Sequence, residues 1–122
     1  MPNKTLYINP VAGFFQVIEI TYLPVTATAG AQTMKLIKVP SGTSAPATGT
    51  YAALVAPRVN LMTNTIALTS AAYTATGGAI SGTLADVRLS NLDRIELIFS
   101  AAINGGAGDV FRGTWGIKLR PI

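Results

Sequence analysis

The sequence predicts a single all-β domain: an antiparallel β-sandwich of jelly-roll type, or a barrel, with about eight strands. Two observations predict this fold. Short runs rich in Val, Ile, Thr, Tyr and Phe recur along the 122 residues, and several of them end at Pro, Gly or Ser, which interrupt a sheet ladder. Helix-period patterns are scarce. A chain of this length buries roughly two-thirds of its unfolded surface, so residues 1–122 are expected to share one core.

The expected strands are of ordinary length. They are residues 4–9, 14–23, 32–39, 50–56, 58–62, 65–71, 79–85, 93–101 and 111–120. Residues 41–85 contain 29 Ala, Ser, Thr or Gly among 45 positions, which predicts flexible loops near 41–49 and 74–82, with a turn at 74–78. A turn of helix within 81–92 is the alternative to a strand there, and Ser90 and Asn91 also fit a turn before the next strand.

The run FFQVIEITYL, residues 14–23, has large apolar groups on both parities. Phe14, Ile18, Ile20 and Tyr22 share one parity, and Phe15, Val17 and Leu23 share the other. A strand that is apolar on both faces is covered on both. The run therefore predicts a central strand or a subunit contact, with Phe15, Val17 and Leu23 as candidate contact residues.

The run DRIELIFSA, residues 93–101, has one strongly apolar face. Ile95, Leu97 and Phe99 form it, while the other face carries Arg94 and Glu96 followed by Ile98. This pattern predicts a strand in the core whose outer face is partly covered.

The closing run FRGTWGIKLR, residues 111–120, alternates. Its apolar parity holds Phe111, Trp115, Ile117 and Leu119, and its polar parity holds Arg112, Thr114, Lys118 and Arg120. Residues on one parity lie about 7 Å apart, so Arg112, Lys118 and Arg120 form a basic ladder on one face of the strand. Asp93, Glu96 and Asp109 are the expected counter-charges on neighbouring strands. A basic patch on a chain of net charge +4 suits docking on an acidic protein surface.

The residues for common catalytic chemistry are few. The chain has no His and no Cys, which excludes Ser-His-Asp triads, thiol nucleophiles and His-based zinc sites. Asp93 and Glu96 are three apart on a strand and point to opposite faces. The run NGGAGD, residues 104–109, lacks phosphate-loop spacing and predicts a hairpin turn. We expect a protein that is not an enzyme and that holds no cofactor or metal.

The sequence also bears on location. The start MPNKTLYINPVAGFF has no long apolar run before Pro10, unlike a secretory signal. Residues 59–85 are uncharged but are interrupted by Asn and Gly, unlike a membrane-spanning helix of about 20 apolar residues. Synthesis in the cytoplasm, with neither a signal peptide nor a transmembrane segment, is the expectation.

In overall character the chain resembles small decoration, or cement, proteins of tailed-bacteriophage capsids. The stretches behind this resemblance are the start MPNKTLYINP, the loops SGTSAPATG and TATGGAISG, and the closing strand FRGTWGIKLRPI. The resemblance implies a structural protein of the virion that forms homo-oligomers on the major capsid protein. Its strand faces would then supply the contacts.

Two other functions fit parts of the pattern. A β-sandwich carbohydrate- or receptor-binding module would need exposed aromatics, for which Tyr7, Tyr51 and Tyr73 are the candidates. A nucleic-acid groove would need aromatics beside the basic ladder, but Phe111 and Trp115 are on the opposite parity, so we expect no nucleic-acid partner. Two of the tyrosines side by side in a cleft would favour the carbohydrate function.

Overall fold

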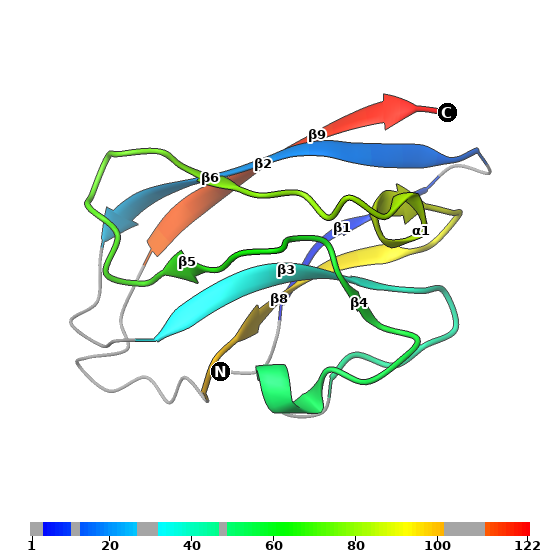
Figure 1. The fold of residues 1–122 in the computed structure, drawn as a ribbon, viewed down its shortest axis with the longest axis horizontal. Helices are drawn as coiled ribbons and strands as arrows, with labels where there is room; N and C mark the ends of the chain where they lie inside the picture. Colours follow the sequence, from blue (N-terminus) through cyan, green and yellow to red (C-terminus); the bar gives the residue numbers. More distant parts are fainter. Residues whose placement is uncertain (1–3, 11–12, 27–31, 47–48, 102–111) are drawn as a thin grey trace.

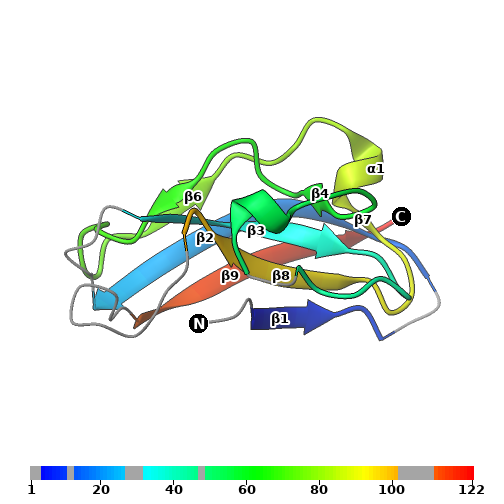
Figure 2. The same ribbon diagram turned by 90° about the horizontal axis from the view of Figure 1, so that it is seen from below.

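Two antiparallel sheets face each other in a computed structural model of the chain, which describes residues 4–10, 13–26, 32–46, 49–101 and 112–122. Neither sheet closes into a barrel, and the two layers form an open sandwich (Figure 1, Figure 2). The prediction of an all-β sandwich is confirmed. In the described part of the chain, no helix has the length and apolar character needed to cross a membrane.

The larger sheet has the order β1–β8–β3–β4, and β5 also pairs with β3. Its strands are β1 Lys4–Ile8, β8 Arg94–Phe99, β3 Thr33–Val39, β4 Val59–Asn60 and β5 Ile66–Ala67. The central strands β3 and β8 have buried residues on both of their faces, as expected for strands in a sheet that is covered on both sides.

The smaller sheet is built on one long strand. Strand β2, Phe15–Thr26, pairs with β9, Arg112–Pro121, along one edge. Along its other edge it pairs with β6, Thr76–Gly78, and β7, Arg88–Leu89. The central position expected for the run 14–23 is therefore correct.

A β-bulge in β2 decides which of its side chains enter the core. Val17 lies opposite Leu119 and Glu19 opposite Lys118, so Ile18 is an extra residue in the ladder. Beyond such a bulge the alternation of faces shifts by one residue. Val17 and Ile20 are consequently both buried in the core. The prediction of Val17 as a contact residue is wrong, because its side chain is fully covered within the chain.

The main core lies between the sheets. Its large members include Val17, Ile20, Met34, Leu36, Leu61, Ile66, Leu89, Ile95 and Phe99. A second cluster, Ile37, Val39 and Ile98, lies on the opposite face of the larger sheet, where Tyr51 and Leu54 pack against it. Strand β8 therefore contributes to both clusters, and its outer face, expected to be partly covered, is buried at both Glu96 and Ile98.

Residues 50–56 are not the predicted strand. They contain a 3₁₀ helix, η1, at Tyr51–Ala53. Side chains three residues apart lie on the same side of such a turn, and Tyr51 and Leu54 both pack on the second cluster. Burial of these two side chains outweighs the β propensity of the run.

The predicted turn at 74–78 is also wrong, since Thr76–Gly78 forms β6 beside β2. A Cβ added at Gly78 would lie 2.7 Å from Met62 Cε, so this glycine permits close approach of the strand to the core. Most of the strand predicted at 79–85 is absent: Ile80 forms an isolated bridge with Met62, and the helical turn α1, Leu84–Val87, follows.

The other expected elements in this half of the chain are present in shorter form. Strand β4 occupies two residues of the run 58–62, and β5 two residues of the run 65–71. A turn precedes β8 as expected, with the Asp93 N–H donating to the Ser90 carbonyl over 3.1 Å. Residues 104–109, with their predicted hairpin turn, lie outside the described residues.

Candidate interaction surface

The outward face of the smaller sheet gathers four cationic side chains from the two strands β7 and β9, which flank β2. Gln16 of β2 lies opposite Arg120 of β9 on one side and Arg88 of β7 on the other, and directly opposed residues share a face. Lys118 lies opposite Glu19, and Arg112 opposite Thr26. All four cations are exposed. We call the surface of Arg88, Arg112, Lys118, Arg120 and Glu19 the basic face.

The apolar parity of β9 explains why these cations point outward. Trp115, Ile117 and Leu119 are half-buried and pack against the main core. The Trp115 ring lies 4.8 Å from the Tyr22 ring, centroid to centroid. Burial of this side of the strand fixes the other side in solvent, so the alternation predicted for the closing run is confirmed from Arg112 onward. Phe111 lies outside the described residues.

Few negative groups offset the basic face. Arg120 Nη2 donates to the neutral Gln16 Oε1 over 2.6 Å. Neither Arg112 nor Lys118 forms an ion pair within 4.0 Å among the residues that the structure describes, although Glu19 is the cross-strand neighbour of Lys118. The face therefore carries four cations and one carboxylate.

The counter-charges expected on neighbouring strands are elsewhere. Glu96 belongs to β8 of the other sheet, and Asp93 lies just before that strand; both are buried. Asp109 lies outside the described residues. The sequence predicts that β9 is a strand but not which strand it pairs with, and its partner is β2.

The buried carboxylates bind groups within the fold. The two oxygens of Asp93 accept from the backbone N–H groups of Ser41, over 2.9 Å, and Ser90, over 2.8 Å. Glu96 Oε2 accepts from Arg94 Nε over 2.8 Å. These acids hold loops and strands together, so they are not available to neutralise the cations on the other sheet.

The contact residues predicted on β2 differ in how far they are exposed. Leu23 is 40% exposed and lies opposite Thr114 on the basic face, whereas Phe15 is half-buried opposite Pro121. The predictions missed Arg88, because it falls between the expected strands 79–85 and 93–101, within the segment 81–92 where a helical turn was the alternative. Its position between the apolar Val87 and Leu89 is the only local signal of an outward-facing side chain.

A second exposed feature lies at the end of the sandwich where β1 ends and β2 begins. Ile8, Phe14, Leu92 and Ile122 are each about half exposed there, and we call them the apolar end. The Leu92 N–H donates to the Asn9 carbonyl, beside Ile8, over 2.7 Å, and the Ile122 N–H donates to the Phe14 carbonyl over 3.1 Å. Leu92 has a φ of 66°, a conformation that costs a leucine about 1–2 kcal/mol.

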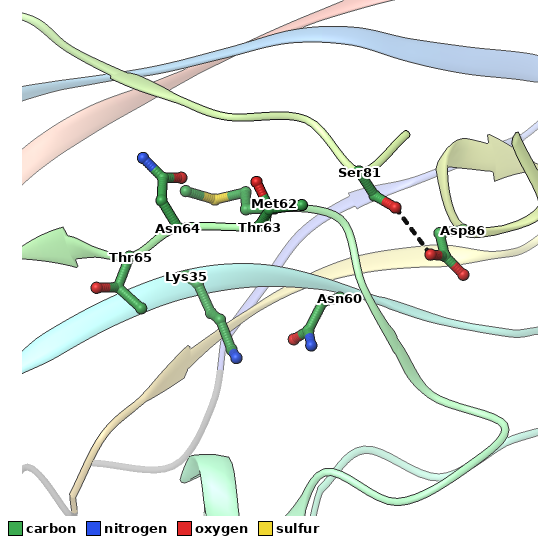
Figure 3. A pocket seen from close by; sticks show the side chains of 8 residues that line it. All are labelled: Lys35, Asn60, Met62, Thr63, Asn64, Thr65, Ser81 and Asp86. Carbon is green, nitrogen blue, oxygen red and sulfur yellow. Dashed lines mark hydrogen bonds between the residues drawn. The ribbon is translucent and has the colours of Figure 1, made fainter. Parts of the chain in front are cut away.

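A polar hollow of about 400 Å³ lies along residues 60–65 (Figure 3). Its charged groups are engaged already: Lys35 Nζ lies 4.4 Å from the centre of the Tyr51 ring, and Asp86 Oδ2 accepts from Ser81 Oγ over 2.8 Å. Burial lowers the pKa of Lys35. The buried Asn60 Oδ1 has no hydrogen-bond partner among the described residues, but the residues that line the hollow offer no convergent set of donors for a particular ligand.

The three tyrosines proposed for carbohydrate stacking are in different places. Tyr7 packs against the main core and Tyr51 against the second cluster, on opposite faces of the larger sheet. Tyr73 is 75% exposed in the loop before β6. No two of them form a stacking platform.

Within the described ranges, no three of the Asp and Glu side chains approach closely enough to hold a metal ion. Comparison of the chain with models of protein families, with curated proteins and with solved structures found no match.

Proposed function

We propose that the chain is a non-enzymatic structural protein of a viral particle, a homo-oligomeric capsid decoration protein that binds the major capsid protein. The observation that carries the proposal is the basic face, where four cations accompany one carboxylate on a sheet surface that no described segment covers. Such a face fits a partner protein with an acidic surface.

The physical effect would be stabilisation of an assembled lattice. A protein that binds the assembled state and not its free subunits shifts the equilibrium toward assembly by mass action. Complementary charge raises the association rate and sets the orientation of docking. Repetition of the contact in an oligomer strengthens attachment further, because the second contact becomes intramolecular.

The apolar end supplies the contact for self-association. Leu92 is exposed although its backbone is strained and a Gly or Asn would fit that conformation better. Strain at an exposed apolar residue is consistent with a role for the side chain outside the monomer. Ile8, Phe14 and Ile122 add neighbouring apolar surface that a second copy would cover.

The oligomer is tested by light scattering after size exclusion over a range of concentrations. We expect a stable oligomer for the wild type and dissociation on dilution for Leu92→Asn, which suits the left-handed backbone. The matched control is Val55→Asn, since Val55 is 58% exposed but lies on the loop after η1. A wild type that is monomeric at every concentration would refute the oligomer.

Attachment is tested by co-sedimentation with purified empty capsids of tailed bacteriophages at low and raised salt. We expect binding that weakens with salt and that Arg112→Gln with Lys118→Gln largely removes. Arg58→Gln is the control, because it also replaces a cation by a neutral amide. Arg58 lies just before β4 of the larger sheet, and its guanidinium donates to the Ser44 and Val55 carbonyls. Failure to sediment with any capsid, together with salt-sensitive binding to an oligonucleotide, would replace the proposal with nucleic-acid binding.

A further inference from the structure

Strand β9 is a long strand at the edge of the smaller sheet. It runs for ten residues and, among the described parts of the chain, pairs with β2 alone. Figure 1 shows it beside β2 with the chain's C-terminus at its end. The free side of such an edge presents unpaired N–H and C=O groups that can template another strand.

We propose that the free edge of β9 binds an acidic, extended segment of the partner protein as an added antiparallel strand. This rests on the proposed attachment function and specifies its contact. The carbonyls and amides of the edge would supply main-chain hydrogen bonds, and the side chains of alternate residues would supply specificity, as in other cases of strand addition.

The spacing of the cations defines the segment that fits. Directly opposed residues of an added strand share a face with their β9 neighbours. Carboxylates opposite Arg120, Lys118 and Arg112 therefore fall at the first, third and ninth positions of an antiparallel segment. Apolar residues at alternate positions would lie opposite Leu119, Ile117 and Trp115, which are half-buried at the rim of the core.

A second copy of the chain fits this edge poorly. In an antiparallel pairing of two β9 strands centred on Gly116, Arg112 would lie opposite Arg120 of the second copy. Centred on Trp115, Arg112 would lie opposite Lys118 of that copy. Like charges directly opposite each other destabilise a strand pair, so the same residues that attract an acidic segment oppose self-pairing here.

The test uses the synthetic peptide EVEVTVTSE, which carries the three carboxylates in this register. Binding is followed by the emission of Trp115, which is the chain's one tryptophan and lies on β9 itself. We expect saturable binding and a shift of the emission to shorter wavelength as the ring is covered. The uncharged peptide QVQVTVTSQ should bind the wild type at least about tenfold more weakly than EVEVTVTSE does. The Lys118→Glu variant should bind EVEVTVTSE at least about tenfold more weakly than the wild type does. Each corresponds to a loss of 1.4 kcal/mol or more in binding free energy.

Strand addition is distinguished from charge attraction by two N-methylated peptides, each methylated at one alternate set of amides. In an antiparallel pair, only alternate amides face the neighbouring strand. We expect one peptide to lose binding and the other to retain it. Equal binding by both would overturn strand addition and leave docking through the basic face intact. The inference would also be overturned if EVEVTVTSE did not bind at about 1 mM. A protein dimer that Lys118→Glu disrupts would overturn it as well. Attachment to the capsid is tested separately, by the sedimentation experiment.

Discussion

Replacement of Gly113 by alanine tests the packing that holds β9 to the rest of the protein. A Cβ at this position would overlap the ring carbon and hydroxyl of Tyr22 and would lie 2.7 Å from the Leu23 carbonyl oxygen. The Tyr22 ring is buried and lies against Trp115, so it cannot turn aside without displacing a second aromatic ring.

The expected loss is that of an overpacked core. Such substitutions typically cost about 1–3 kcal/mol, and we expect Gly113→Ala to lower the free energy of unfolding by about 2 kcal/mol. For a chain of this size, that loss corresponds to a fall in Tm of roughly 6–10 °C. Urea denaturation followed by tryptophan emission measures both the stability and the environment of Trp115.

The matched control is Gly77→Ala in β6 of the same sheet, where an added Cβ meets nothing within 4 Å. Its stability should change by no more than about 0.5 kcal/mol. Tyr22→Leu provides the second side of a double-mutant cycle, because Gly113→Ala should cost clearly less when the ring is absent. Equal losses for Gly113→Ala in both backgrounds would refute the argument that the Tyr22 ring is the obstacle.

Three further changes test other parts of the fold by urea denaturation. Phe99→Ala, in the fully buried centre of the core, should cost about 3–5 kcal/mol, and Phe99→Leu clearly less; equal losses would contradict cavity formation. Asn9→Ala should cost about 1–3 kcal/mol, because the buried amide donates to the Leu89 and Ser90 carbonyls and its loss removes both hydrogen bonds. Burial lowers the pKa of Lys38 below its ordinary value of 10.5, so the unfolded chain binds more protons there and wild-type stability should rise with pH toward that value. Lys38→Met should show a smaller rise, because Lys35 keeps its own lowered pKa, and an unchanged pH profile would contradict the cause.

The strands that could be predicted from sequence are those whose alternation is uninterrupted. Ile95, Leu97 and Phe99 identify the core face of β8, and Trp115 and Ile117 that of β9, because each strand has one strongly apolar parity. The pattern did not extend to β2, where the extra residue Ile18 reverses the faces. A bulge leaves no composition signal in this run, since both parities are apolar.

Other errors come from tertiary contacts that outweigh local preference. Gly77 and Gly78 resemble a turn in sequence, but they form β6 because the chain approaches Met62 and Ile20 too closely for a larger residue at Gly78. Tyr51 resembles a strand residue, but its place on the second cluster favours a helical turn. In both cases the deciding neighbour is distant in sequence.

The basic face was predictable only in part, because strand pairing joins its members. Alternation alone gives Arg112, Lys118 and Arg120, whereas Arg88 joins them through the pairing of β7 with β2. The same lack of pairing information placed the counter-charges on the wrong sheet. A sequence pattern predicts the faces of a strand but not its neighbours.

The separation of charges has a consequence for experiments on function. Asp93 and Glu96 are buried and hydrogen-bonded, so their removal would leave donors unpaired inside the fold. Arg112 and Lys118 are exposed and make no ion pair with the described residues, so neutral replacements there should change stability by no more than about 0.5 kcal/mol. Because the groups that stabilise the fold and the groups proposed to bind the partner are different residues on different sheets, loss of binding in Arg112 and Lys118 variants would reflect the surface itself and not unfolding.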